Sequence, residues 1–267
     1  MCPVTDADRL STIDRTLIKN GGKHMKILTD KTMSFGNIHY FCAYIGSEPL
    51  TCYVLRGRNG DMLIDTGLPF VYKELLRYLG DFDIRFIFLT HAHTDHDSNA
   101  ERLRKRFGAE IILGERDREL IGHFRRQPVK ATAQRYRLRN MGQNLIGGMK
   151  LFNTRPYSPD ILINGSSPGL SGELGFEGRT VLLPGHTLGS AGIFSDGVLY
   201  CGDAFTAIWG KPDITPHAAS PRAMVRSLKK ILELSPQWIA TGHGLPVSMQ
   251  EAKPVIRRYV FNHGQLK

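Results

Sequence analysis

An almost uninterrupted apolar run, 84–90, leads directly into the segment His91-Ala92-His93-Thr94-Asp95-His96. Such a run predicts a strand that is buried on both faces. A helical pattern over 98–107 and a short strand pattern over 110–113 follow, which is the order of a βαβ unit. Imidazole and carboxylate groups bind divalent cations well, and α/β sheets commonly bind ligands beyond the carboxyl ends of their strands. The segment is therefore a candidate metal site.

Strand and helix patterns alternate along the rest of the chain in two similar halves, each a β meander followed by a helix. The length of 267 residues suits one large domain. We expect a single α/β domain over 25–267, with a basic helical insertion at about 115–150, a loop over 158–172 and a loosely ordered extension over 1–24. The expected strands are 38–45, 51–56, 61–65, 84–90, 110–113, 173–176, 179–183, 191–194, 198–201 and 238–241, and the expected helices are 70–79, 98–107 and 222–234.

The net charge of +10 is concentrated in the insertion, where residues 115–150 hold nine Lys or Arg against three acids. Two interpretations stay open: a solvated basic helical face, or a surface that attracts an anion. Only Phe124 and Tyr136 lie among these charges, fewer than the stacking platforms usual in a single-strand binding groove. We therefore favour a small-molecule substrate, which an anionic charge would suit, over nucleic acid as the partner.

The sequence argues against a membrane-spanning or a secreted protein. The apolar stretches are far shorter than the roughly 20 residues of a membrane span. The first 26 residues contain no apolar signal segment. The four cysteines, Cys2, Cys42, Cys52 and Cys201, form no CxxC pair and are too sparse for a disulfide framework. We expect a cytoplasmic protein with reduced thiols and no membrane partner.

Three more candidate ligand motifs each follow an apolar strand pattern. They are Pro184-Gly185-His186-Thr187, Gly202-Asp203 and Thr241-Gly242-His243-Gly244. A single histidine at a strand end is more often an ordinary core or surface residue. Here, however, five of the ten histidines fall within these motifs and the segment 91–96. The repeated placement favours one shared site.

Together with Leu63-Ile64-Asp65-Thr66-Gly67, these motifs resemble the metallo-β-lactamase-fold hydrolases over about residues 37–250. The resemblance implies a four-layer αββα sandwich with two metal ions at one edge of its sheets. It implies a first metal on His91, His93 and His186, a second on Asp95, His96 and His243, with Asp203 bridging both and Asp65 orienting a ligand histidine. The aspartate at 203 together with His96 and His243 is more similar to the glyoxalase II and lactonase branches than to true β-lactamases.

A pair of cations sharing one carboxylate would bridge a hydroxide that serves as the nucleophile, and Asp95 would handle a proton. Zinc is the first expectation for both ions, and iron or manganese also suit these ligands. We expect hydrolysis of a small ester, thioester or lactone. A phosphodiesterase or nuclease with the same metals is the alternative, and a β-lactamase or a non-catalytic binding relative is favoured less.

The candidate substrate-binding residues lie shortly after Asp203 and within the insertion. Phe205 and Trp209 are candidates for the pocket wall, and Lys211 lies near the position of a glutathione-contacting lysine in the glyoxalase II branch. The insertion could form a lid over the metals, with arginines that favour an anionic substrate and with these apolar residues facing the pocket: Leu120, Ile121, Phe124, Leu138, Met141 and Leu145. The alternative is a helical hairpin packed away from the metals.

Overall fold

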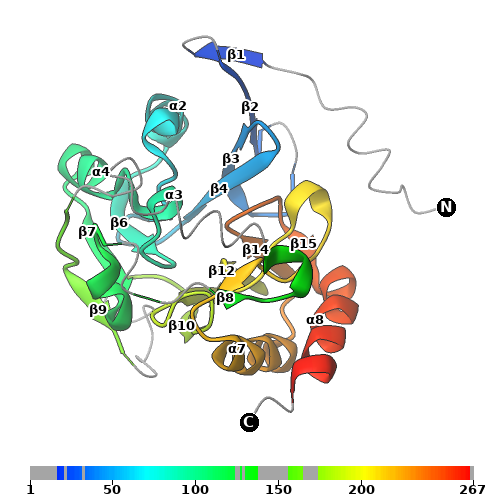
Figure 1. The fold of residues 1–267 in the computed structure, drawn as a ribbon. Helices are drawn as coiled ribbons and strands as arrows, with labels where there is room; N and C mark the ends of the chain where they lie inside the picture. Colours follow the sequence, from blue (N-terminus) through cyan, green and yellow to red (C-terminus); the bar gives the residue numbers. More distant parts are fainter. Residues whose placement is uncertain are drawn as a thin grey trace.

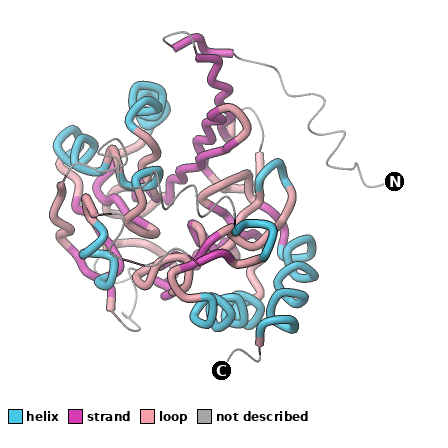
Figure 2. The backbone as a smooth tube through the Cα atoms, viewed as in Figure 1, coloured by secondary structure: helices cyan, strands magenta, loops and turns pink. Residues whose placement is uncertain are grey.

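The computed structural model describes residues 17–20, 23–31, 34–123, 127, 130–137, 156–164 and 174–264. Two β-sheets form the centre of the molecule, and helices lie on their outer sides (Figure 1). Figure 2 shows the same arrangement, with most strands inside and most of the helices at the periphery, while β1 and the start of β2 project from the top of the molecule.

The larger sheet has eight strands in the order β1-β2-β3-β4-β5-β6-β7-β9. Pairing from β1 to β5 is antiparallel, and pairing from β5 to β9 is parallel. Gly46, with φ of 61°, makes the tight turn between β3 and β4. The strands are β1 Leu17–Asn20, β2 Lys23–Thr29, β3 His39–Ile45, β4 Glu48–Leu55, β5 Asp61–Ile64, β6 Ile84–Leu89, β7 Glu110–Gly114 and β9 Ile161–Ile163.

Helical crossovers connect the parallel strands of this sheet. Between β5 and β6 the chain forms η1 Pro69–Val71, α2 Tyr72–Tyr78 and η2 Leu79–Asp81, and between β6 and β7 it forms α3 Thr94–Asp97 and α4 Ala100–Phe107. Gly108 ends α4 in the left-handed conformation that glycine adopts most readily. Every residue of β6 except Arg85 is buried, as the apolar run 84–90 predicts.

The smaller sheet has five strands in the order β10-β11-β12-β14-β15. Its strands are β10 Arg179–Leu182, β11 Ala191–Ser195, β12 Val198–Gly202, β14 Trp238–Thr241 and β15 Val247–Ser248. The helices α7 Pro221–Leu234 and α8 Met249–His263 pack on it and on each other. A separate two-stranded sheet pairs β8 Lys130–Ala131 with β13 His217–Ala218. The described residues also form the 3₁₀ turns η3 Glu115–Leu120, η5 Gln134–Tyr136 and η7 Ile208–Gly210.

Three buried clusters define the layers. Neighbouring residues of one strand point to opposite faces, so Ile87 packs against α2 and α4 whereas Phe88 packs between the sheets. Likewise, Tyr200 packs between the sheets, whereas Leu199 packs with residues of α7 and α8. Three interfaces separate four layers. The predicted αββα sandwich is therefore confirmed, with the site at the edge where strands of both sheets end.

Several local predictions differ from the structure. The insertion does not begin as an α-helix: it starts with the 3₁₀ turn η3, and Lys130–Ala131 is a strand, because its backbone pairs with β13 across the fold. Residues 174–176 form no strand, and the expected loop 158–172 contains β9, which extends the parallel edge of the larger sheet. Residues 138–150 and Glu173 lie outside the described residues. The predicted boundary between residues 24 and 25 falls within β2.

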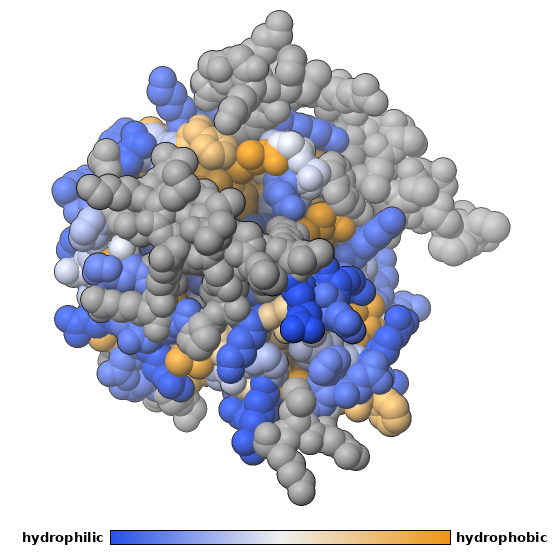
Figure 3. Space-filling view, in the orientation of Figure 1, coloured by the Kyte–Doolittle hydropathy of each residue, from blue (hydrophilic) through white to orange (hydrophobic). Residues whose placement is uncertain are grey.

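The C-terminal helix α8 was not expected from the hydrophobic pattern. Its start carries a recognisable signal, because the Ser248 side chain accepts the backbone N–H of Glu251 while the Glu251 side chain accepts that of Ser248. Among the described residues, no helix combines the length and the apolar character that crossing a membrane requires. Hydrophilic side chains make up most of the coloured surface on the face shown in Figure 3.

Candidate metal centre

The candidate ligands lie on loops that leave the carboxyl ends of strands in both sheets. His91 and His93 follow β6, and Asp203 and His243 follow β12 and β14. His186 lies in the turn between β10 and β11. Segments up to 150 residues apart therefore meet at one edge of the sandwich, and the structure brings all seven predicted ligands together in three overlapping groups.

The first group holds the three histidines expected to bind the first metal. Nδ1 of His93 lies 3.1 Å from Nε2 of His91 and 3.0 Å from Nε2 of His186. Extended backbone at His93, with φ of −99° and ψ of 149°, lets the two histidines of the His-x-His pair approach the same point. All three residues are buried, so they present three nitrogen ligands in a site shielded from bulk water.

The second group consists of Asp95, His96 and His243. The short helix α3 carries the first two of these residues in its first turn. Oδ2 of Asp95 lies 3.3 Å from Nε2 of His243 and 3.9 Å from Nε2 of His96. One carboxylate oxygen and two imidazole nitrogens therefore face a common point.

Asp203 lies between the two groups. Its Oδ2 atom is 3.5 Å from Nε2 of His186 and 3.3 Å from Nε2 of His243, and its Oδ1 atom is 3.5 Å from Nε2 of His96. The carboxylate therefore contacts one imidazole of the first group and two of the second. This is the position that a residue shared by two cations requires.

Four of the five imidazoles, those of His91, His96, His186 and His243, have a polar neighbour at the nitrogen that faces away from the common points. Nδ1 of His243 lies 2.9 Å from the carbonyl oxygen of Pro49, and Nδ1 of His186 lies 3.1 Å from that of His217. A carbonyl only accepts, so these Nδ1 atoms carry the protons and leave the Nε2 lone pairs available to a metal. Nδ1 of His91 lies 3.1 Å from the Thr90 hydroxyl.

Asp65 makes the contact expected of a carboxylate that orients a ligand. Its Oδ2 atom lies 2.8 Å from Nδ1 of His96 and accepts the Thr90 hydroxyl at 2.8 Å, while its Oδ1 atom accepts the backbone N–H of Thr90 at 2.8 Å. Asp65 has φ of 60°, a left-handed conformation that few residues other than glycine, asparagine and aspartate adopt. Its side chain therefore ties the end of β5 to the end of β6.

We expect Asp65→Asn to weaken metal binding at the second group by about 10- to 100-fold, the usual cost of losing a partner of a ligand histidine. Asparagine tolerates the backbone conformation, so the change is confined to the charge and the hydrogen bonds of the side chain. Competition titration with a metallochromic chelator measures the affinity. Asp61→Asn, which removes another buried carboxylate at the start of the same strand, is the control. Equal metal binding by Asp65→Asn and the wild type would contradict this role.

Strand β4 of the larger sheet holds the segment that carries His243. The backbone N–H of Thr51 donates to the Gly242 carbonyl at 2.9 Å, and its hydroxyl donates to the Gly244 carbonyl at 2.7 Å. The Tyr53 hydroxyl donates to the Thr241 carbonyl at 2.8 Å. No local sequence pattern indicates these contacts, because the partners are nearly 200 residues apart in the chain.

Glycine at position 242 leaves room for the side chains of the site. A Cβ atom at that position would lie 2.5 Å from Cε1 of His96 and 2.6 Å from Oδ1 of Asp203. Atoms do not approach this closely without displacement. The two ligand side chains therefore depend on the missing side chain of Gly242.

Burial and charge divide the histidines into two sets. Burial, with neighbouring imidazoles, lowers the pKa of His93 to about 3 and holds the pKa values of His91 and His186 well below the usual range. These three are neutral at pH 7, which is the form that binds metal. Burial also acts against a charged His96, but the carboxylates of Asp65 and its neighbours outweigh it and raise the pKa of His96 to about 9.

The residues present fit a pair of divalent cations. Nε2 of His96 and Oδ1 of Asp203 are buried without a hydrogen-bond partner among the described residues, although buried polar atoms of this kind are normally satisfied. The seven side chains supply five imidazole nitrogens and two carboxylates, with no thiolate. Such ligands suit zinc, iron and manganese. Cys42, Cys52 and Cys201 are buried free thiols in the core, and Cys2 lies outside the described residues.

The residues predicted to contact substrate are not brought together in the way that the predicted metal ligands are. Phe205 has no exposed surface and packs in the core with residues of α7 and α8, so it does not line an open pocket. Lys211 is exposed beyond η7, and its contact with substrate stays a prediction. The side chain of Trp209 lies outside what the structure describes. His217, not expected at the site, lies beside it, with ring centroids 4.5 Å from His186 and 5.9 Å from His93.

The described part of the insertion reaches the loop that carries His217. Ala131 pairs with His217, and Arg135 forms an ion pair of 2.7 Å with Asp213. The guanidinium of Arg135 is therefore paired within the protein, and the expected attraction of an anionic substrate by the arginines of the insertion stays a prediction. Leu120 packs in the core beneath α2 and α4 and not in a pocket. The other apolar residues of the predicted lid, except Ile121, lie outside the described residues, so the lid itself stays a prediction.

The sequence from residue 46 to 243 matches the model of the metallo-beta-lactamase superfamily. The chain is 27% identical over 214 residues to the uncharacterized protein YobT of Bacillus subtilis, covering 73% of this chain and 83% of that one. It is 27% identical over 168 residues to a hydroxyacylglutathione hydrolase of Shewanella pealeana, covering 62% and 46% of the two chains. The solved structure of TTHA1623 in a di-iron-bound form aligns with a TM-score of 0.56 and 21% identity over 86% of this chain and 97% of that one.

The family match covers most of the chain and ends at the last candidate ligand. The chain belongs to the metallo-β-lactamase superfamily, a family of metal-dependent hydrolases. The predicted resemblance is thereby confirmed, and its His and Asp groups could hold metal.

Proposed function

We propose that this protein is a dinuclear metal-dependent hydrolase of a small ester, thioester or lactone. The observation that carries the proposal is the position of Asp203, whose carboxylate lies within 3.5 Å of imidazoles from both ligand groups. His91, His93 and His186 would hold one cation, and Asp95, His96 and His243 would hold the other. When bound, two such cations lower the pKa of water toward neutrality and polarise the bond to be cleaved.

The main contribution of the protein residues would be to hold the cations and the substrate in position. The first group would supply three imidazoles together with the shared carboxylate of Asp203, with no thiolate closing the site, so water could also bind a cation held there. Asp95 has the most exposed side chain of the seven, at 34%, so its carboxylate can meet a substrate that enters from solvent. We assign to Oδ2 of Asp95, 3.3 Å from Nε2 of His243, the acceptance of a proton from the attacking water and its transfer to the leaving group.

The substrate class follows from the ligand set and one relative. The hydroxyacylglutathione hydrolase is named for hydrolysis of a hydroxyacylglutathione, and this chain shares 27% of its residues with it over the matched region. Asp203 together with His96 and His243 also separates this ligand set from that of typical β-lactamases. The positive net charge of +10 favours a substrate that carries negative charge.

Zinc is the expected metal, with iron or manganese as the alternatives. TTHA1623 carries two irons in its solved structure, and oxygen and nitrogen ligands suit all three metals. Elemental analysis of protein purified without chelator would identify the ions. Two equivalents of metal per chain are expected, and a single equivalent would contradict the dinuclear site.

The substrate proposal is tested with a panel of hydrolysable compounds on metal-free and metal-reconstituted protein. The panel contains aryl esters, lactones, S-lactoylglutathione, a β-lactam, bis-p-nitrophenyl phosphate and single-stranded RNA. We expect metal-dependent turnover of an ester, thioester or lactone. Turnover of only the phosphodiester or RNA would instead favour a phosphodiesterase or nuclease, the second candidate suggested by the basic charge. Absence of all turnover with two metals bound would favour a binding protein.

We expect metal removal to destabilise the fold as well as to end catalysis. A ligand present at 100 times its Kd stabilises the native state by about 2.7 kcal/mol, which corresponds to roughly 5–10 °C in Tm for a domain of this size. Differential scanning calorimetry before and after chelation measures the change, and added zinc should restore both Tm and activity. An unchanged Tm in the presence of chelator would show that metal is not bound by the folded protein.

A further inference from the structure

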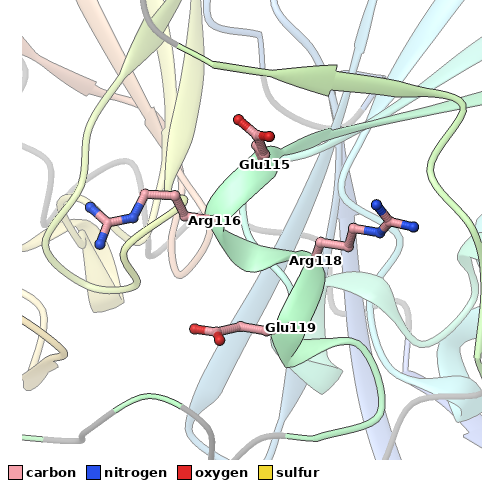
Figure 4. A pocket seen from close by; sticks show the side chains of 4 residues that line it. All are labelled: Glu115, Arg116, Arg118 and Glu119. Carbon is pink, nitrogen blue, oxygen red and sulfur yellow. The ribbon is translucent and has the colours of Figure 1, made fainter.

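The 3₁₀ turn η3 turns one carboxylate inward while its other charged side chains point outward. Glu115, Arg116, Arg118 and Glu119 line a hollow of about 580 Å³ on the outer side (Figure 4). Asp117, in the middle of the same turn, has no exposed surface. Asp117 and Leu120 are three residues apart and are the buried residues of η3, as expected for the three-residue period of a 3₁₀ turn.

The buried carboxylate of Asp117 accepts hydrogen bonds from four neutral groups. Oδ1 accepts the backbone N–H of Gly189 at 2.7 Å and the amide of Gln127 at 3.3 Å. Oδ2 accepts the Thr187 hydroxyl at 2.6 Å and the backbone N–H of Ala92 at 3.2 Å. Burial raises the pKa of Asp117, and these hydrogen bonds act in the opposite direction. A fully buried carboxylate with only neutral donors is costly, so its position calls for a specific explanation.

The partners of Asp117 belong to the two segments that carry the first ligand group. Ala92 lies between His91 and His93, and Thr187 directly follows His186. A single side chain thus joins loops that are more than 90 residues apart in the sequence. One backbone hydrogen bond, from the N–H of Ala191 to the Thr90 carbonyl at 2.9 Å, also joins these segments, and the contacts of Asp117 add to it next to the ligands themselves.

The backbone around Asp117 is packed in a way that depends on glycine. A Cβ atom at Gly189 would lie 2.5 Å from the backbone nitrogen and 2.7 Å from the carboxyl carbon of Asp117. A Cβ atom at Gly114, just before η3, would lie 1.9 Å from the carbonyl oxygen of Gly189. The carboxylate is therefore held at close range by the loop after His186. Gln127 also contacts the loop after His186, because its side-chain amide oxygen Oε1 accepts the backbone N–H of Leu188 at 2.7 Å.

We propose that Asp117 is a positioning residue that fixes the distance between the His91–His93 segment and His186, and so sets the geometry of the first metal group. This inference rests on the proposed function, because it assigns Asp117 a role in holding that group's cation. Asp117 itself touches none of the seven ligand side chains in the described contacts; it acts through the backbone of Ala92 and through Thr187.

The consequence is a selective loss of affinity when the junction is broken. Groups that support metal ligands typically contribute 10- to 100-fold to metal affinity. Asp117→Asn keeps the size of the side chain but places an amide where one of the donors now points. We expect its affinity for the first metal to fall by about 10- to 100-fold, with the second group, built from Asp95, His96 and His243, much less affected.

Thr187 provides a matched pair of milder variants. Thr187→Val removes the hydroxyl that donates to Asp117 and nearly preserves the shape, whereas Thr187→Ser keeps the hydroxyl. We expect Thr187→Val to weaken the first metal site and Thr187→Ser to restore it. Glu115→Gln removes an exposed carboxylate from the same turn and should leave both affinities unchanged.

The test is stepwise titration of metal-free protein with zinc against a competing chelator, repeated with cobalt, whose absorption spectrum reports the coordination geometry of each site. Selective weakening of the first affinity and an altered cobalt spectrum in Asp117→Asn and Thr187→Val would support the proposal. Affinities and spectra equal to wild type in both variants would overturn it. Equal weakening of both sites in Thr187→Val would also overturn it, because that result indicates general destabilisation.

Hydrogen exchange separates this proposal from the proposed function. In metal-free protein, the amides of Ala92 and Gly189 should exchange faster in Asp117→Asn than in wild type, while amides of the distant helix α8 should not change. If the wild type binds no metal, the proposed function fails, yet this measurement still reports whether Asp117 joins the two loops. Unchanged exchange at both amides would contradict the joining role whatever the metal content.

Discussion

Replacing Asp203 with asparagine is expected to lower kcat by more than about 100-fold and to leave the protein with one bound metal in place of two. The residue is 5% exposed and contacts imidazoles of both ligand groups. Asparagine has the same size but lacks the charge and one of the two acceptor oxygens, so it cannot serve both cations. The expected loss therefore exceeds the roughly 10- to 100-fold effect of residues that only support a ligand. Steady-state kinetics with the substrate identified from the panel, together with metal analysis, measures it.

Asp196→Asn is the matched control for this substitution. It removes the same charge from the turn between β11 and β12, where asparagine tolerates the φ of 48°. We expect wild-type kinetics and two metals in this control. If Asp203→Asn also kept two metals and full activity, the carboxylate would not be shared and the dinuclear proposal would be wrong.

Gly242→Ala is expected to give the second large effect, again of about 100-fold in kcat. The new methyl group would lie 2.5 Å from His96 and 2.6 Å from Asp203, so at least one of these side chains must move. A displacement of about 1 Å at a reacting centre can cost about 100-fold in rate. We therefore expect weaker binding at the second group and lower activity, measured by metal titration and by kinetics.

Gly80→Ala provides the control for the general effect of adding a methyl group. No atom lies within 4 Å of a Cβ at that position, and its backbone is in an ordinary conformation. We expect the control to keep wild-type metal content and activity. Full activity of Gly242→Ala with a normal complement of metal would show that the loop can relax without disturbing His96 and Asp203.

Much of the fold could be predicted because it depends on local patterns. The short continuous apolar runs of strands such as β6 and β12 predict strands buried on both faces, and the helical spacing of α7 identifies the face that packs in the core. Elements of two or three residues escaped prediction, since β8, β9 and β13 are too short to show a period. They are strands only because a partner backbone lies beside them.

In the candidate site, too, some features could be predicted from local sequence and others depend on packing. Ligand types and their strand-end positions are visible in the sequence, so the seven candidate ligands could be singled out before their distances were known, whereas the role of Asp65 was implied by the family resemblance. Phe205 could not be placed correctly, because residues near a metal ligand face either the pocket or the core, and only packing decides which. Nothing local distinguishes Asp117 from the other charged residues of η3.

The sequence by itself determined which side chains could bind metal and at which strand ends they lie, because ligand chemistry and hydrophobic periodicity are properties of short segments. Tertiary structure alone decided the rest: the distances from Asp203 to imidazoles of both groups, the hydrogen bonds from β4 to the His243 loop and the hydrogen bonds of Asp117 to two histidine loops. Those contacts depend on the relative placement of segments that are far apart in the chain, and packing of whole layers fixes that placement.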